Sequence, residues 1–374
     1  MKDCTTTSDI IYRPNAIRAL CRIIDGTTVQ AIERLIKTAI VDKSPPVSSA
    51  ALVSSYHLFP LAKEVVRRWA SEAQDSIVSA RAWTTSGSAT GFPVNTVVSP
   101  ASFMTQYHGL GLLYLMRQQD RMAVTKIIQQ FSGGFGQDTG RGGSTTTLKS
   151  PQAVVMLIRF ASKVMKEDPK YSRLLDLLTC SMREPLHRLL EGWLRHKSDM
   201  VNFEAARAIC AMDNVTDKEV APAIQLLQLF LTSPRFIGRF TAIRILQNFA
   251  TTHPRLVNPL NQDIEALISD TNRSIATYAI TTLLKTGNDA SVDRLMKEIT
   301  GFMGSITDEF KVTIVEAIRS LSLKFPSKQG VMLGFLAGVL RDEGGFDYKK
   351  AVVEAMFDMI KYIPDSREEG TTPT

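Results

Sequence analysis

The sequence predicts an all-α solenoid of stacked helical hairpins, and three observations support that prediction. An alanine recurs at the centre of an apolar segment, and the apolar residues around it are spaced as on one side of a helix. No segment alternates apolar and polar residues with turns spaced for a sheet. Hydrophobic residues make up 44% of the 374 residues, enough for a buried core, and we expect residues 1–374 to form a single solenoid trunk.

The repeat is clearest in the second half of the chain. The central alanines are separated by 37, 37, 38 and 38 residues, and they are Ala205, Ala242, Ala279, Ala317 and Ala355. A fixed period of this length is typical of HEAT/armadillo-like repeats. A small residue at the midpoint of each copy lets neighbouring helices approach closely, so each copy is expected to be a hairpin in which a shorter helix precedes the alanine-centred one.

Helix-breaking residues fall where the hairpins should divide. Ser233-Pro234, His253-Pro254, Gly287-Asn288-Asp289 and Phe325-Pro326 lie between apolar segments, where the missing N–H of proline costs least. The first half shows less regular copies of the same unit, which are 14–20, 47–58, 106–114 and 151–164.

Two stretches rich in Gly, Ser and Thr interrupt the first half, and a polar segment closes the chain. We expect flexible inserts at 84–99 and 132–150 and a disordered tail at 364–374. The second insert contains the glycine-rich segment 133–144, which invites comparison with a phosphate-binding loop. It lacks the G-K-[ST] step and a preceding strand, so we interpret it as part of the insert.

No arrangement of residues indicates catalysis, a metal site or a cofactor. The five histidines are scattered, and His57 and His108 lie in apolar helical segments, where a lone histidine is usually a satisfied core residue. No Ser, His and acid pattern or paired carboxylates are apparent. We therefore do not expect an enzyme.

The charge of the chain is mildly basic, with a formal net value of +7. Single arginines occur on the helices, and four of them recur next to the repeat alanine or one turn away, so they could align as a basic ladder along the stacked helices. The arginines are Arg18, Arg207, Arg244, Arg273 and Arg319. The alternative is pairing with acids on adjacent repeats, such as Glu204, Glu316 or Asp308. Aromatic residues do not alternate with these arginines, so a nucleic-acid partner is not expected.

Cysteine usage and hydropathy favour a cytoplasmic protein. Cys4, Cys21, Cys180 and Cys210 are far apart and form no C-x-x-C pair, which is typical of reduced thiols. The longest apolar stretch, 331–340, is too short to span a bilayer. Any membrane association is expected to run through partners or through the protein surface.

Several long strings resemble the trunk of the coatomer gamma-subunit family, an adaptin-like HEAT solenoid of the COPI coat. The longest is 270–287, DTNRSIATYAITTLLKTG, followed by SVDRLMK at 291–297. The others lie at 31–34, 39–43, 51–55, 106–108, 112–114, 308–311 and 343–346. Together they extend from about Asp9 to Lys361, so the resemblance covers most of the chain. It implies a fragment that begins several helices inside the trunk and ends where the family continues into more helices.

The resemblance implies a structural role without catalysis. Family members bind the coatomer zeta, beta and delta subunits, and an Arf-family GTPase in its GTP form recruits the coat to Golgi membranes. Golgi-to-ER retrograde and intra-Golgi vesicle transport follow from coat assembly. The expected location is therefore the cytoplasm, with peripheral attachment to the cytosolic face of Golgi membranes and COPI-coated vesicles.

Two sets of interface residues follow as expectations. Arg13, Asn15 and Arg18 are expected at the edge of the GTPase site, which the resemblance places toward the N-terminal helices. The small zeta subunit is expected on the polar side of one repeat helix, opposite Ile275, Ala279 and Leu283. That set is Arg273, Ser274, Thr277, Tyr278, Thr281 and Lys285. The double change Arg273→Glu, Lys285→Glu is expected to weaken zeta binding without changing the melting temperature.

Without the resemblance, other scaffolds remain open. A nuclear transport receptor and a phosphatase scaffold are both helical arrays with protein ligands. The basic charge counts mildly against a transport receptor, which usually presents an acidic surface to cargo. A nucleic-acid-binding repeat would need a continuous and unpaired basic ladder.

Overall fold

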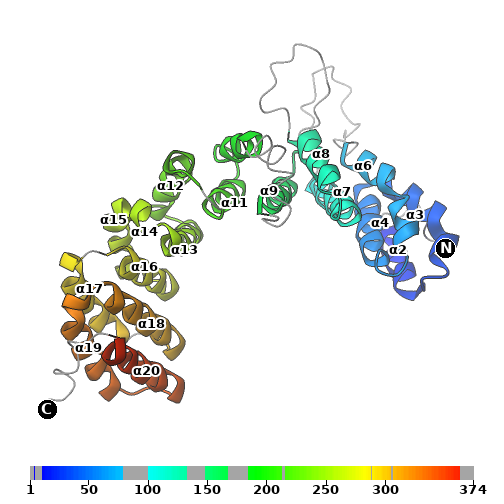
Figure 1. The fold of residues 1–374 in the computed structure, drawn as a ribbon. Helices are drawn as coiled ribbons and strands as arrows, with labels where there is room; N and C mark the ends of the chain where they lie inside the picture. Colours follow the sequence, from blue (N-terminus) through cyan, green and yellow to red (C-terminus); the bar gives the residue numbers. More distant parts are fainter. Residues whose placement is uncertain are drawn as a thin grey trace, which may run out of the picture. The chain divides into compact units, whose positions relative to one another are not determined.

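The computed structural model describes residues 4, 11–78, 100–132, 148–166, 184–212, 215–287, 289–304 and 306–362. Every regular element in these ranges is a helix, which confirms the predicted all-α solenoid class (Figure 1). The expected insert at 84–99, the glycine-rich segment 133–144 and the expected tail at 364–374 lie outside the described residues. Of the insert at 132–150, only Ser132 and residues 148–150 are described.

The chain divides into two compact units, residues 1–214 and 215–374, which are described separately. The second helices of the hairpins in unit 1 are α2 (Tyr12–Ile23), α4 (Pro45–Leu58), α7 (Pro100–Arg117), α9 (Pro151–Lys166) and α11 (Asp199–Cys210). Each packs against the next in this order. The first helices of unit 1 are η1 (Val29–Ile32) with α3 (Glu33–Ile40), α5 (Lys63–Arg67) with α6 (Ala70–Val78), α8 (Arg121–Phe131) and the helical residues 184–193.

Unit 2 repeats the same arrangement. Its second helices are α13 (Phe236–Thr252), α16 (Arg273–Thr286), α18 (Asp308–Lys324) and α20 (Phe346–Tyr362), and each packs against the next. Its first helices are α12 (Asp217–Leu231), α17 (Asp289–Met303) and α19 (Gln329–Arg341), the last preceded by η4 (Pro326–Lys328). The hairpins that the alanine period predicts are therefore present in unit 2.

One first helix departs from the expected hairpin. The segment between α13 and α16 consists of α14 (Pro254–Val257), η2 (Asn258–Leu260), α15 (Asn261–Ala266) and η3 (Leu267–Ser269). Proline begins α14 and stands again inside η2, and each lacks the N–H that a continuous helix would use. The pieces still bury Val257, Ile264 and Ile268 against their neighbours.

Capping residues fix where several helices begin. Thr216 and Glu219 form a capping box at the start of α12, and the Asp120 side chain accepts a hydrogen bond from the Ala123 N–H at the start of α8. Pro45 stands in the first turn of α4, where its missing N–H is not needed. These local signals agree with the breakers found in the sequence.

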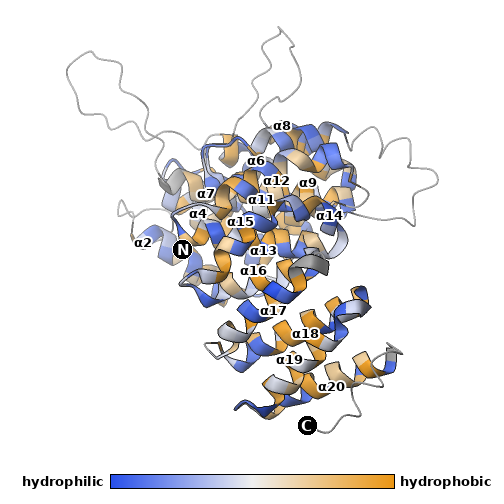
Figure 2. Ribbon diagram, turned by 90° about the vertical axis from the view of Figure 1, so that its left-hand side faces the viewer, coloured by the Kyte–Doolittle hydropathy of each residue, from blue (hydrophilic) through white to orange (hydrophobic). Residues whose placement is uncertain are grey.

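The repeat alanines lie where second helices pack together. Ala205, Ala242 and Ala279 are fully buried and Ala355 is 2% exposed. Ala317 is only half-buried, because Ile314, Val315 and Ile318 form the buried side of α18. Figure 2 shows hydrophobic and hydrophilic residues interleaved along individual helices such as α18 and α20, as expected of helices with one buried side. No described helix has the length and apolarity needed to cross a membrane.

Candidate protein-interaction surfaces

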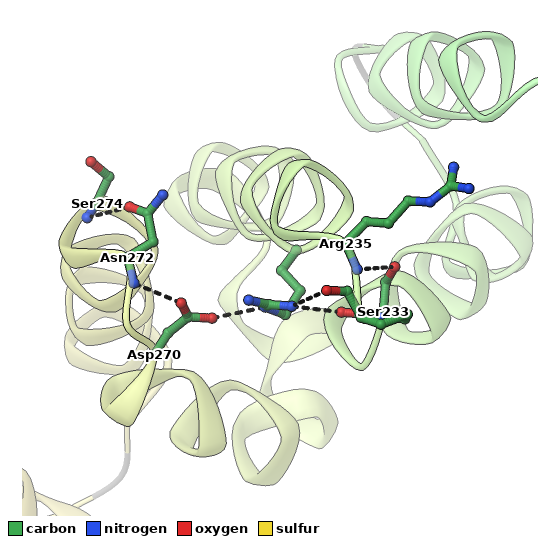
Figure 3. Close-up of polar contacts among 7 residues, drawn as sticks. Ser233, Arg235, Asp270, Asn272 and Ser274 are labelled. Atoms are coloured by element: carbon green, nitrogen blue, oxygen red, sulfur yellow. Dashed lines mark hydrogen bonds and ion pairs between the residues drawn. The ribbon is translucent and has the colours of Figure 1, made fainter.

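An arginine–aspartate contact joins two repeats in unit 2 and shows how the turns before second helices are built (Figure 3). The Arg239 Nε donates to Asp270 Oδ2 at 2.8 Å, and Arg239 Nη1 donates to the carbonyl oxygens of Ser233 and Pro234 at 2.8 and 3.1 Å. The backbone N–H of Asn272 donates to Asp270 Oδ1 at 2.8 Å. The Asp270 carboxylate thus links α13 to the turn that begins α16.

Burial of Asp270 would raise the pKa of its carboxyl, but hydrogen bonds from the Asn272 N–H and the Arg239 guanidinium outweigh burial and hold that pKa below its ordinary value. The side chains of Arg239 and Asp270 are 19% and 5% exposed. This contact is therefore a structural link between repeats rather than a binding site.

Arg13, one of the predicted GTPase-site residues, makes the same kind of arginine–aspartate contact. Arg13 Nη2 donates to Asp42 Oδ2 at 2.6 Å, Arg13 Nε donates to the Cys4 carbonyl, and the Ser44 N–H donates to Asp42 Oδ1 at 2.8 Å. Asp42 therefore stands before α4 as Asp270 stands before α16. Arg13 is half-buried and its guanidinium links α2 to the next repeat, and its place at a GTPase site stays a prediction.

Two residues of the predicted zeta-binding set are buried inside the repeat stack. Thr277 and Thr281 are 3% and 2% exposed. The Thr277 Oγ1 donates to the Arg273 carbonyl at 2.8 Å, and the Thr281 Oγ1 donates to the Thr277 carbonyl at 3.0 Å. The sequence placed both hydroxyls on an open polar face, but they are satisfied within α16 and are not accessible in this chain.

The remaining residues of that set divide between packing and surface. Tyr278 is half-buried, with its ring edge-on to Phe240 of α13 at 5.7 Å between centroids. Arg273 is exposed, and its guanidinium lies over the Phe302 ring at 5.5 Å. Ser274 is half-buried beside the Asn272 side chain, which accepts from the Ser274 N–H. Arg273, Ser274 and the outer part of Tyr278 therefore remain near the surface.

Lys285 holds two repeats together. Its ammonium donates to Thr251 Oγ1 at 2.9 Å and to the Gln247 carbonyl at 3.4 Å, both on α13. Burial lowers the pKa of Lys285 below its ordinary value. Replacing this lysine by glutamate would put a carboxylate against a backbone carbonyl, so the structure leads us to expect that the double change Arg273→Glu, Lys285→Glu lowers the melting temperature.

The N-terminal second helices present a polar cluster that includes the other two predicted GTPase-site residues. Asn15 and Arg18 are exposed on α2, and Arg18 Nη1 donates to Asn15 Oδ1 at 3.2 Å. On the next two second helices, Ser49 Oγ and His108 Nδ1 are hydrogen-bonded at 2.8 Å. Partial burial first, and the positive charge of Arg18 second, lower the pKa of His108 below its ordinary value and favour the neutral imidazole.

The arginines do not form one continuous ladder. Arg207 pairs with Glu204 of its own helix, and Arg319 pairs with Asp358 of the next repeat rather than with Glu316. Asp308 pairs with Lys311 and accepts from the Gly345 N–H. Arg244 is exposed on α13. Paired and exposed arginines therefore coexist along the second helices.

Of the two histidines expected in the core, His108 is partly buried and His57 is not. His108 is half-buried and satisfied by Ser49, as a core histidine would be. His57 is exposed beside Tyr56, because the buried side of α4 at this end is formed by Ser54, Ser55 and Leu58. Among the residues that the structure describes, no cluster of His, Cys, Asp or Glu could hold a metal ion.

The residues that the sequence did not single out are the aspartates of the turns. Asp42 and Asp270 each follow a first helix. Each stands two residues before the N-cap of the next second helix. Their arginine partners lie 29 and 31 residues earlier in the chain. The separation between arginine and aspartate is slightly shorter than the repeat period. Such an arginine–aspartate pair was therefore visible in the sequence.

The sequences of known proteins show which family this chain belongs to. The chain matches the Adaptin N terminal region family over residues 1–372. It is 48% identical over 371 residues to the probable coatomer subunit gamma of Schizosaccharomyces pombe, covering 99% of this chain and 39% of that protein. It is 47% identical over 370 residues to the coatomer subunit gamma of Arabidopsis thaliana, covering 99% and 37%. The chain thus spans about two fifths of the length of these relatives.

Solved structures share the fold at low identity. A chain of a homology model of the full-length AP-3 complex superimposes with a TM-score of 0.57 at 12% identity, covering 98% of this chain and 62% of that chain. Importin beta superimposes with a TM-score of 0.54 at 12% identity, covering 98% and 48%. Such identities show the solenoid fold alone. The family match and the sequence identities together show that the chain belongs to the adaptin N-terminal family and resembles the coatomer gamma subunit over nearly its whole length.

Proposed function

We propose that this chain is a trunk segment of a structural subunit of the COPI vesicle coat, acting as a scaffold for other coat subunits rather than as an enzyme. The observation that carries the proposal is the 48% identity to a coatomer gamma subunit across 99% of the chain. A repeat solenoid suits that role, because each added hairpin extends the accessible surface without a new core.

The second helix α16 offers the surface for the small zeta subunit. Its contact set is narrower than the helical spacing suggested, and consists of Arg273, Ser274 and the outer part of Tyr278. Arg273 carries the largest part, because its guanidinium is exposed and its position is held by the Phe302 ring.

The test is a binding titration of the chain with purified coatomer zeta subunit. Arg273→Glu should weaken binding at least about tenfold, as loss of a central interface arginine does. The matched control is Arg255→Glu, which reverses an exposed arginine on α14 of the same unit. Equal affinities for both variants and the parent would contradict the assignment of α16.

An Arf-family GTPase in its GTP form is assigned to the cluster on α2, α4 and α7, through Asn15 and Arg18. These side chains are exposed, whereas Arg13 is held by Asp42. A pull-down with the GTPase loaded with GTP should retain the chain, and GDP loading should not. Arg18→Glu should abolish retention, while Arg34→Glu, which reverses an exposed arginine on α3, should not. Retention that ignores the nucleotide would contradict this site.

The remaining expectations follow from membership of such a coat. The chain would contact the beta and delta subunits and reach the cytosolic face of Golgi membranes and COPI-coated vesicles through the complex, in Golgi-to-ER retrograde and intra-Golgi transport. A nuclear transport receptor or a phosphatase scaffold has less support, because the importin beta likeness rests on 12% identity. A folded chain that fails to co-purify with other coatomer subunits would contradict the coat assignment.

A further inference from the structure

Four consecutive second helices of unit 1 lack acidic residues. The sequences of α2, α4, α7 and α9 contain no Asp or Glu, and these helices pack against each other in that order. Among the first helices, α3 and α6 carry acids that pair with nearby cations, as in the contacts of Lys37 with Glu72 and of Arg68 with Glu33. Acidic residues are therefore absent from this run of four second helices, while α3 and α6 contribute them among the first helices.

At the end of this series, two arginines share one carboxylate. Arg159 Nε on α9 donates to Glu204 Oε1 at 2.8 Å. On α11, Arg207 donates to both carboxylate oxygens, at 2.5 Å from Nη2 and at 3.2 Å from Nε. The Glu204 side chain is 11% exposed, whereas the Arg159 and Arg207 side chains are 64% and 47% exposed. The acid is thus beneath the surface and the two guanidiniums are at it.

Glu204 fixes the orientation of both arginines without cancelling their charge. Burial would raise the pKa of Glu204, but its hydrogen bonds with Arg207 and Arg159 outweigh burial and hold that pKa below its ordinary value. The carboxylate therefore stays ionised, and one positive charge of the three groups is left over. Because Arg159 uses Nε for this contact, its terminal nitrogens remain accessible in the geometry that pairs two-by-two with a carboxylate.

An aromatic pair adjoins these cations. Lys163 follows Arg159 by one turn of α9, and its ammonium lies 5.5 Å from the centroid of the Tyr114 ring on α7. Tyr114 stacks on Phe160 with 3.9 Å between centroids and 7° between planes. We call Tyr114, Arg159, Lys163 and Arg207 the Arg159 surface, and it extends over three consecutive second helices.

We propose that the Arg159 surface binds an acidic peptide segment of a partner protein. Carboxylates of the segment pair with the guanidiniums of Arg159 and Arg207, and an apolar side chain lies against Tyr114. An anionic bilayer fits less well. A bilayer-binding surface gains from projecting apolar side chains, whereas Tyr114 is half-buried on Phe160.

The experiment uses the whole chain and a fluorescein-labelled peptide of alternating glutamate and alanine with one tyrosine. Fluorescence anisotropy should show binding that weakens with added salt, and at least about tenfold weaker binding of the matching glutamine peptide. The double variant Arg159→Glu, Lys163→Glu should reduce affinity for the glutamate peptide at least about tenfold. The control Lys126→Glu, Arg188→Glu reverses two exposed cations of first helices in the same unit and should stay within about twofold of the parent.

Glu204→Gln separates a positioned site from a diffuse positive surface. This variant adds one positive charge but loosens both guanidiniums, so weaker peptide binding supports the proposal. Tighter binding would overturn it, because charge alone would then account for affinity. Circular dichroism checks that each variant keeps the helicity of the parent.

Vesicles of phosphatidylcholine with about 30% phosphatidylserine form the second arm, read by flotation. Vesicle binding that the Arg159→Glu, Lys163→Glu variant loses, without peptide binding, would overturn the proposal in favour of a lipid surface. Binding of neither probe would also overturn it. The outcome is independent of the coat assignment, because the same double variant leaves Arg273 and Arg18 intact and should bind zeta and the GTPase like the parent.

Discussion

Two arginine–carboxylate contacts of the same chemistry have different roles in the two units. In unit 2, Arg239 gives its donors to Asp270 and to two backbone carbonyls, and both side chains are nearly covered. In unit 1, Arg159 and Arg207 share Glu204 and remain about half or more exposed. The difference teaches that exposure and leftover donors, rather than the presence of an ion pair, separate a structural link from a candidate binding surface.

The largest effect on stability is expected from disrupting the helix packing of α16, the helix that follows the Arg239–Asp270 contact. Ala279→Asp would put a carboxylate without a partner between α13, α16 and α18, at a fully buried position. We expect a loss of about 3–5 kcal/mol in the free energy of unfolding, measured by urea denaturation followed by circular dichroism. Ala317→Asp, at the half-buried equivalent position, should cost clearly less; equal losses would refute the difference in packing between the two repeats.

Removing each carboxylate tests the comparison directly. Asp270→Ala leaves the covered Arg239 guanidinium without its charged partner and should cost about 2–3 kcal/mol. Glu204→Ala leaves two arginines that water can reach and should cost about 1 kcal/mol. Both are read by the same denaturation experiment. A larger loss for Glu204→Ala would mean that the unit 1 cluster is structural too.

The ionisation of Asp270 should contribute to the pH dependence of the stability of the folded chain. Its pKa is lowered on folding, so its contribution is fully present above the unfolded pKa of about 3.9 and is lost as pH falls through the folded value. Parent and Asp270→Asn should therefore differ in melting temperature at pH 7, and the difference should begin to shrink below about pH 4 and disappear below the folded pKa. A difference that persists unchanged at low pH would exclude the ionised carboxylate as its source.

A smaller effect is expected at His108. Arg18 is the second cause, after burial, of the lowered pKa of this imidazole. Arg18→Glu replaces a nearby positive charge by a negative one and should raise the pKa of His108. An NMR titration of the histidine ring protons measures it, with Arg34→Glu as control. An unchanged pKa of His108 in this variant would mean that Arg18 lies too far from the Ser49–His108 pair to affect it.

The sequence predicted the hairpins because alanines and apolar residues repeat with a period that only stacked helices satisfy. It did not predict the divided segment α14–η3, because short 3₁₀ turns around two prolines leave no period to detect. It misplaced Thr277 and Thr281 for a related reason. A threonine can satisfy its hydroxyl on the carbonyl four residues earlier, so a polar residue at the right spacing does not require water.

The lysines at the ends of the second helices give the array a direction. Lys285 donates to the Gln247 carbonyl near the end of α13, and Lys324 donates to the Lys285 carbonyl near the end of α16. The carboxyl-terminal parts of α13 and α16 thus each receive a donor from the following repeat. Unfolding either repeat of such a pair breaks this hydrogen bond and exposes the apolar surface that the two second helices share. The direction of donation thus marks the order of the repeats, while the coupling of their stabilities is mutual.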